Sequence, residues 1–181
     1  MNETMKLIEG MKKLKVLEKH IDRNTERILM YSSAPSNEKP TFGDEKTQKS
    51  EVKQLIQSNT DLVNEYLHLK NRVDMTNLTT TVSIGKRGFK IIDLLILRRG
   101  LAKRMEKTFH ALDTTYADKR LSSMQRNISL QPGEKAPHAI RFYDENEKFE
   151  GLQDWQTLQD EIEQRLEVIN ATTDLVTIKA H

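Results

Sequence analysis

Cationic side chains gather in one part of this 181-residue sequence. Residues 82–104 hold seven Lys and Arg residues against Asp93 alone, a local charge of +6, whereas the whole chain carries a net charge of only +2. Guanidinium groups form forked hydrogen bonds with phosphates, and lysine ammonium groups add positive charge. The stretch is therefore a candidate site for an anionic ligand, and its candidate residues are Lys86, Arg87, Lys90, Arg98 and Arg99.

Arg98 has two interpretations, because it falls on the apolar stripe of a predicted helix. A stripe arginine needs an acid, a carbonyl group or a ligand anion to offset its desolvation. One interpretation is an ion pair with an acid of the last predicted helix, such as Glu163. The other is a forked clamp on a phosphate, with Arg99 beside it. Residues 85–88 similarly form either an anion-binding hairpin tip or a solubilising turn.

A short motif occurs twice, at residues 72–82 and 165–175, each time where a predicted helix ends. One interpretation is a repeated helix C-cap, in which Asn takes the left-handed conformation and Thr hydroxyls bond the freed carbonyl groups. The other is a pair of polar corners that line related ligand pockets. The second interpretation adds six candidate ligand-binding residues, which are Asn77, Thr79, Thr80, Asn170, Thr172 and Thr173.

The sequence offers no residue set typical of catalysis or of a metal site. Cysteine is absent, which excludes disulfides and thiolate ligands. Glu65 and His68 share a helical face, as in carboxylate-bridged metal bundles, but nothing supplies the further ligands that such sites need. Residues 85–88 are too short for a phosphate-binding P-loop, and no serine lies in a nucleophile elbow. We predict a protein that is not an enzyme and has no cofactor and no metal.

The elements that must position these residues are predicted to be long helices. Apolar residues repeat every seven positions in the first helix, at Leu7, Leu14, Ile21 and Ile28, and at alternating spacings of three and four in the second. Asn24 and Asn59 interrupt the stripes, where polar residues fix register. The predicted fold is mainly α, a long antiparallel bundle of about four helices in one domain over residues 1–181. The helices are predicted near 4–30, 50–77, 92–120 and 152–170, with a β-hairpin near 79–91 between the second and third. A flexible loop is predicted at 32–50 and an irregular segment at 122–150.

Four short motifs, in this order, resemble a family of small, functionally uncharacterised bacterial and phage proteins, some labelled septicolysin. The motifs are MKLIEGM at 5–11, NLTTTV at 77–82, GFKIIDLLILRR at 88–99 and INATTDL at 169–175, and the resemblance covers about residues 5–31, 51–112 and 150–176. The sequence departs from the family at Gly100, where an acidic residue is usual, and over 122–149. The resemblance implies an oligomeric helical bundle with a hairpin and implies no reaction.

These features together predict a non-enzymatic, oligomeric binding protein with basic pockets for an anionic, nucleotide-type small ligand. If the chain is encoded by a phage, it could sequester an immune signal. The alternative is a structural or protein-interaction scaffold without a ligand, in which the basic surface pairs with the acidic surface of residues 138–174 in another subunit. Neither nucleic acid nor a membrane is expected as a partner. The lack of cysteine fits a cytoplasmic location.

Overall fold

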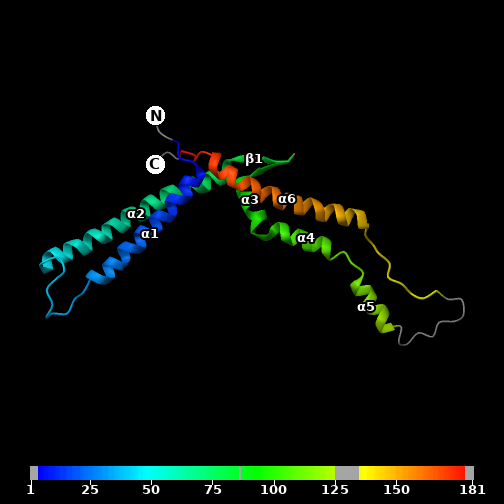
Figure 1. Cartoon of the computed structure of the whole chain (residues 1–181), viewed down its shortest axis with the longest axis horizontal. Helices are drawn as coiled ribbons and strands as arrows, with labels where there is room; N and C mark the ends of the chain where they lie inside the picture. The colour runs from blue at the N-terminus through cyan, green and yellow to red at the C-terminus, as the bar shows by residue number, and fades with distance from the viewer. Residues whose placement is uncertain (1–3, 86, 125–134, 178–181) are drawn as a thin grey trace. The chain divides into compact units, whose positions relative to one another are not determined.

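The structure, a computed structural model, describes residues 4–85, 87–124 and 135–177. It is mainly α-helical, with one two-stranded hairpin between the second and third helices, which confirms the predicted fold class (Figure 1). The chain divides into two compact units. Unit 1 comprises Met1–Val82 and Leu166–His181, and unit 2 comprises Ser83–Arg165. The single domain predicted for residues 1–181 stays a prediction, and each unit is described by itself.

Unit 1 is built on two long helices, α1 (Leu7–Tyr31) and α2 (Glu45–Thr79), which lie side by side and run in opposite directions (Figure 1). Part of the predicted heptad stripe forms the buried seam between them, whereas its residues Ile21 and Ile28 are only half-buried. Leu7, Leu14 and Leu17 of α1 are buried, as are Leu55, Leu69 and Val73 of α2. Burial of these aliphatic side chains supplies the main stabilisation of the pair.

The predicted register residues lie at the α1–α2 seam. Asn24 is buried and donates from its Nδ2 to the Ser58 hydroxyl at 3.2 Å. Asn59 donates from its Nδ2 to the Ile21 carbonyl at 3.3 Å and to the Thr25 hydroxyl at 3.2 Å. These bonds form only when the two helices are aligned in this one way, which agrees with a role in fixing register.

The loop before α2 is shorter than predicted, because α2 begins at Glu45 rather than near residue 50. Asp44 caps the helix by accepting from the Thr47 backbone N–H at 2.9 Å. Gln48 then connects both ends of the loop. Its side-chain amide donates to the Tyr31 carbonyl at 2.8 Å and accepts from the Phe42 N–H at 3.2 Å.

The C-terminal segment of unit 1 lies against the beginning of α1. Leu7 donates its N–H to the Thr173 carbonyl at 2.8 Å, and Leu175 donates to the Met5 carbonyl at 2.9 Å. The Leu175 side chain is buried against Gly10. A Cβ atom at Gly10 would lie only 2.7 Å from Leu175 Cδ1, so the close approach requires glycine there.

The hairpin consists of β1 (Thr81–Ile84) and β2 (Arg87–Lys90). Gly85, with a φ of 55°, begins the tight connection, as hairpin turns of this length require. The chain then enters α3 (Ile91–Ile96) directly. Ile91 and Leu94 are fully buried and anchor this short helix in the core of unit 2.

The prediction of one continuous helix over residues 92–120 is wrong. The chain forms α3, a π-helical turn η1 (Leu97–Leu101), α4 (Ala102–His110) and α5 (Thr115–Met124). The first break lies at Gly100, whose φ of 139° and ψ of −2° are outside the helical region and are readily adopted by glycine only. The second break precedes Thr115, whose N–H donates to the Asp113 carboxylate at 3.0 Å.

The last helix, α6 (Glu145–Thr172), starts seven residues earlier than predicted, so the irregular segment is correspondingly shorter. Asp144 accepts from the N–H groups of Asn146 at 2.6 Å and Glu147 at 3.2 Å, which satisfies the first turn. Gly151 lets α4 approach α6, because a Cβ atom there would lie 2.3 Å from Phe109 Cε1. Across the three described stretches, no helix has both the length and the apolar character needed to cross a bilayer.

Candidate functional site

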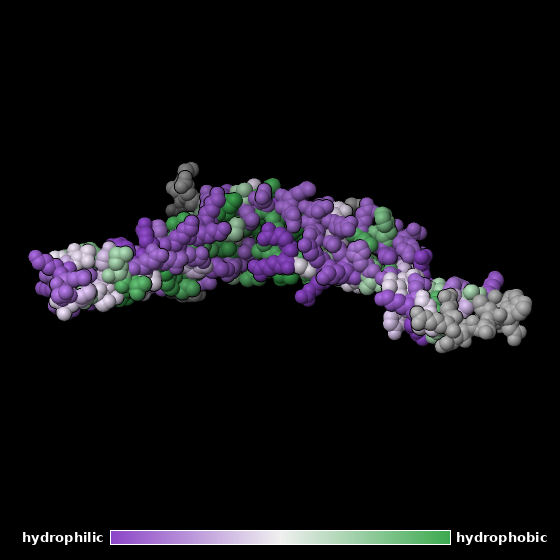
Figure 2. Space-filling model, turned by 60° about the horizontal axis from the view of Figure 1, so that its bottom comes forward, coloured by the Kyte–Doolittle hydropathy of each residue, from purple (hydrophilic) through white to green (hydrophobic). Residues whose placement is uncertain are grey.

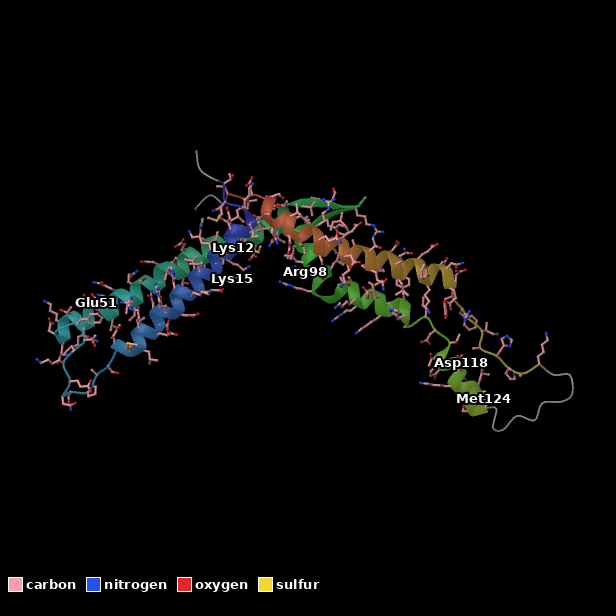
Figure 3. The ribbon with its side chains drawn as sticks, in the orientation of Figure 1. Lys12, Lys15, Glu51, Arg98, Asp118 and Met124 are labelled. Carbon is pink, nitrogen blue, oxygen red and sulfur yellow. The ribbon has the colours of Figure 1, made fainter. Side chains whose placement is uncertain are left out.

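The break at Gly100 determines where the paired arginines lie. The π-helical turn changes the angular position of every residue that follows α3, so the predicted apolar stripe does not continue through Arg98. Arg98 is exposed, and its side chain extends away from the ribbon (Figure 3). The prediction that Arg98 lies on a core stripe is therefore wrong, and the residue carries no burial penalty that an internal partner must offset.

Four cationic residues surround this break, and we call them the kink cluster: Arg98, Arg99, Lys103 and Arg104. All four are exposed. Among the residues that the structure describes, no carboxylate lies within ion-pair distance of any of them. The ion pair between Arg98 and Glu163, which was the structural alternative for Arg98, is not formed. The kink cluster is therefore a patch of four cations within seven residues that is accessible to an external anion.

A polar cleft of about 310 Å³ adjoins the kink cluster within unit 2. Residues of α4 and α6 line it, and they are Lys103, Glu106, Gln156, Gln159 and Asp160. Lys103 belongs to both the cluster and the cleft. The two glutamine amides offer donors and acceptors, whereas the two carboxylates accept hydrogen bonds from hydroxyl or N–H groups. Sequence reasoning missed this cleft because its lining residues come from two helices, and those of one helix lie at least 50 positions from those of the other.

The two described cations of the hairpin do not join the kink cluster. Arg87 and Lys90 are exposed, whereas Lys86 lies outside the described residues. In Figure 1 the hairpin and α4 lie on opposite sides of α6, and a Cβ atom at Gly85 would lie 3.7 Å from the Glu161 carboxylate of that helix. Arg87 and Lys90 therefore do not form one binding site with Arg98 and Arg99.

Apart from Arg165, the two copies of the repeated motif belong to unit 1, and both end a helix in the same way. The Thr79 hydroxyl donates to the Met75 carbonyl at 2.7 Å, and the Thr172 hydroxyl donates to the Val168 carbonyl at 2.8 Å. The following residues, Thr80 and Thr173, donate their N–H groups to the carbonyls of Thr76 and Ile169 at 3.0 and 2.9 Å. These matching bonds support the C-cap interpretation of the motif.

The expected role of the asparagines in that C-cap is wrong. Asn77 lies within α2 and Asn170 within α6, and no residue other than glycine has a positive φ in the described stretches. Helix α2 ends on an extended threonine instead, since Thr80 has a φ of −78° and a ψ of 124°. The Asn77 Oδ1 atom is buried and has no hydrogen-bond partner in the part of the chain described.

One polar arrangement in unit 1 was not predicted from the sequence, namely the attachment of the C-terminal segment to α2. The Val176 N–H donates to the Thr76 hydroxyl at 3.0 Å, and Arg72 Nε donates to the Val176 carbonyl at 3.0 Å. Asp174 pairs with Lys6 at 2.7 Å, and this hydrogen-bonded partner holds the pKa of the Asp174 carboxyl below its usual value. These contacts stabilise the fold and present no group to a ligand.

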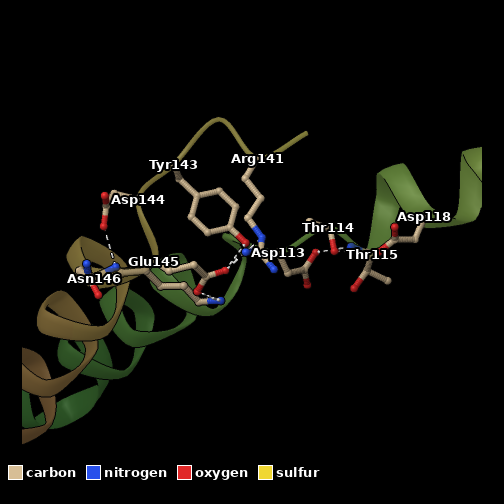
Figure 4. A network of polar contacts seen from close by, with 10 residues as sticks. Asp113, Thr114, Thr115, Asp118, Arg141, Tyr143, Asp144, Glu145 and Asn146 are labelled. Atoms are coloured by element: carbon tan, nitrogen blue, oxygen red, sulfur yellow. Dashed lines mark hydrogen bonds and ion pairs between the residues drawn. The ribbon is translucent and has the colours of Figure 1, made fainter. Parts of the chain in front are cut away.

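A polar network joins the segment before α6 to the start of that helix (Figure 4). Glu145 accepts from the Tyr143 hydroxyl at 3.1 Å and from Arg141 Nε at 3.3 Å. Desolvation, together with the hydrogen bond to Glu145, raises the pKa of the Tyr143 hydroxyl. The network connects the chain that enters α6 with the first turn of that helix.

Glu65 and His68, the pair considered for a metal site, lie on the surface of α2. Both residues are exposed, and Glu65 instead pairs with Lys13 at 2.6 Å. Within the described ranges, no three His, Asp or Glu side chains converge as a metal ion would require. Searches of protein-family models, curated proteins and solved structures find no match to this chain, so the resemblance to the septicolysin-labelled family stays a prediction.

Proposed function

We propose that this chain is a non-enzymatic protein that binds a phosphorylated, nucleotide-type small molecule at the kink cluster and the adjoining cleft. The observation that supports this proposal is the set of four exposed cations at Arg98, Arg99, Lys103 and Arg104, for which the described part of the chain provides no carboxylate partner. Guanidinium forks of the two arginines would hold phosphate oxygens.

The lining of the cleft favours a nucleotide over an inorganic anion. Glu106 and Asp160 would repel a second phosphate, but their carboxylates can accept hydrogen bonds from ribose hydroxyls. Gln156 and Gln159 carry amides that can pair with the polar edge of a base. The proposed ligand therefore places its phosphate on the kink cluster and its sugar and base in the cleft.

The proposed setting is a cytoplasmic homo-oligomer that sequesters its ligand rather than converting it. No residue pair described above joins a nucleophile to a base, so binding without turnover fits the chemistry of the site. If the chain comes from a phage, the sequestered molecule would be a nucleotide signal of host immunity. The corners at Asn77 and Asn170 have no role in this proposal, because their threonines are engaged in ending helices.

Isothermal titration tests the proposal with a panel of cyclic mononucleotides, cyclic dinucleotides and ADP-ribose derivatives, with sodium phosphate and adenosine as controls. We expect heat from at least one phosphorylated compound and none from adenosine, and we expect the compound to be recovered unchanged. Binding should weaken as salt is raised, because the exposed cations are screened. Silence across the whole panel, or conversion of the compound, would contradict the proposal.

A second candidate function is a protein-interaction scaffold without a small ligand, and exposed apolar side chains favour it. On α2, Ile56 and Leu67 are 53% and 54% exposed, which is unusual for large aliphatic residues of a seam helix. If charged surfaces hold the scaffold together, high salt should dissociate the oligomer, whereas an oligomer held by apolar seams should survive. Sedimentation at low and high salt separates these cases.

A further inference from the structure

An apolar groove of about 430 Å³ runs along one side of the α1–α2 pair, wholly within unit 1. Its lining residues are Ile21, Ile28, Ile56, Asn59, Thr60, Val63 and Asn64. Val63 is 42% exposed although it lies in the groove, and hydrophobic side chains reach the surface of this pair in Figure 2. The groove is therefore incompletely covered in a single copy. Burial of this surface against a partner would remove apolar area from water.

A polar atom beside the groove also lacks a partner. Asn59 lines the groove and uses its Nδ2 for two bonds within the helix pair, but its Oδ1 is buried and accepts no hydrogen bond within the described ranges. This atom is enclosed by the helix pair itself, so the groove offers its polar contacts through Thr60 and Asn64, which lie among its aliphatic residues.

The spacing of the groove residues fits pairing with a second copy about a two-fold axis at Thr60. An antiparallel copy of α2 that is centred on Thr60 brings Ile56 of one copy close to Val63 of the other. The same operation brings residue 53 of one copy level with residue 67 of the other. Each α2 stripe then covers an identical stripe, as an isologous interface requires.

Charge at the two ends of the groove is complementary under the same operation. Lys53 is exposed and lies seven residues before Thr60, on the same face of α2. Glu18 is exposed and lies level with Tyr66, whose hydroxyl donates to its carboxylate at 2.9 Å. Lys53 of one copy therefore comes opposite Glu18 of the other, and it does so twice in the dimer.

We propose that two copies of this chain dock through the α1–α2 groove with their helix pairs antiparallel, forming a four-helix contact centred on Thr60. This inference is independent of the ligand proposal and stands if the kink cluster binds nothing. Packing of the Ile56 and Val63 stripes supplies the stabilisation, and the contact between Lys53 and Glu18 selects the antiparallel orientation.

A charge-reversal series with sedimentation equilibrium as the readout tests the orientation. Lys53→Glu places two carboxylates opposite each other at both ends of the interface, so the dimer Kd should rise about tenfold. Glu18→Lys should do the same, and the double variant should restore the wild-type Kd. Circular dichroism checks that each variant keeps its helix content. A double variant weaker than either single variant would overturn the antiparallel arrangement.

Single cysteines test the axis directly, because the native chain has none. Thr60→Cys should oxidise to a covalent dimer, since the two Thr60 positions face each other at the axis. Gln54→Cys, exposed on another face of α2, is the matched control and should stay monomeric on denaturing gels. A monomer in sedimentation, or a dimer that survives Val63→Asp and fails to cross-link through Thr60→Cys, would overturn the proposal in favour of a different partner or interface.

Discussion

The helix α2 and the segment from α3 to α4 begin from similarly aliphatic sequences but form different structures. The first is an unbroken helix of 35 residues, whereas the second is interrupted after a few turns at Gly100. The stripe of α2 continues with spacings of three and four over its seam with α1, so each turn is stabilised by its neighbour helix. A single glycine in the other segment adopts a φ of 139°, which ends the α-helical hydrogen bonding there.

The two regions also differ in how their polar groups are satisfied. Along the α1–α2 pair, Lys13 bonds Glu65 and Asn24 bonds Ser58 across the two helices. At the kink, the four clustered cations have no carboxylate near them in the part of the chain that the structure describes. The comparison shows polar groups paired with one another along the helix pair and cations exposed at the kink.

The largest expected effect comes from a substitution that disrupts the seam between α1 and α2. Leu17→Ala should lower the free energy of unfolding by about 2–5 kcal/mol, because a buried leucine leaves a cavity that its neighbours fill only partly. Leu17 is 4% exposed, whereas Val16 beside it is 48% exposed. Urea denaturation followed by circular dichroism measures both, and Val16→Ala as the control should lose less than about 1 kcal/mol. Equal losses would show that the seam does not lie where the structure has it.

The next largest effect is expected from a substitution that strains the kink at Gly100. Gly100→Ala should cost about 1–3 kcal/mol, because an alanine side chain is disfavoured at a φ of 139°. The control is Gly43→Ala, whose φ of 99° imposes a similar strain in the loop before α2. Both variants should melt at lower temperature, but only Gly100→Ala should also weaken ligand binding. Equal ligand affinities in the two variants would show that the kink geometry does not matter for binding.

The smallest effect concerns the attachment of the C-terminal segment of unit 1. Lys6 lowers the pKa of the Asp174 carboxyl in the folded state below its ordinary value of 3.8. The ion pair therefore stabilises the fold fully at pH values above 3.8. That contribution is lost as the pH falls below 3.8 through the lowered pKa. The melting temperature should therefore decline less steeply between pH 5 and pH 2 in Asp174→Asn than in the wild type. Lys6→Gln should show the same weaker pH dependence of the melting temperature. An unchanged pH dependence in either variant would show that the ion pair does not contribute to stability.

The fold was predictable from sequence where a repeating pattern extends over several turns. The seam residues Leu7, Leu14 and Leu17 are buried as their spacing indicates, and the hairpin forms where turn residues separate short alternating stretches. Gly100 was not recognised as a break, because an isolated glycine within a helical pattern is often tolerated. The contact between Thr76 and Val176 joins residues 100 positions apart and leaves no periodic signal.

The candidate site was predictable in composition but not in arrangement. The paired arginines were identified from local charge, whereas their exposure follows from the conformation of Gly100. The threonines of the repeated motif have the residue types of a ligand pocket, yet their hydroxyls are used by the helix carbonyls four residues before them. Residue types were therefore sufficient to locate the basic region. Only the backbone geometry shows that the arginines are exposed, whereas the threonine hydroxyls are used within the fold.

The most direct test of the central claim, that the kink cluster holds a phosphorylated ligand, is a titration of two matched double variants with the tightest-binding compound of the panel. Arg98→Gln with Arg99→Gln should raise the Kd by at least about a hundredfold, because two charge-assisted forks are lost. Lys12→Gln with Lys15→Gln removes the same charge from exposed positions on α1 and should leave the Kd unchanged (Figure 3). Equal affinities in the two double variants would contradict the claim.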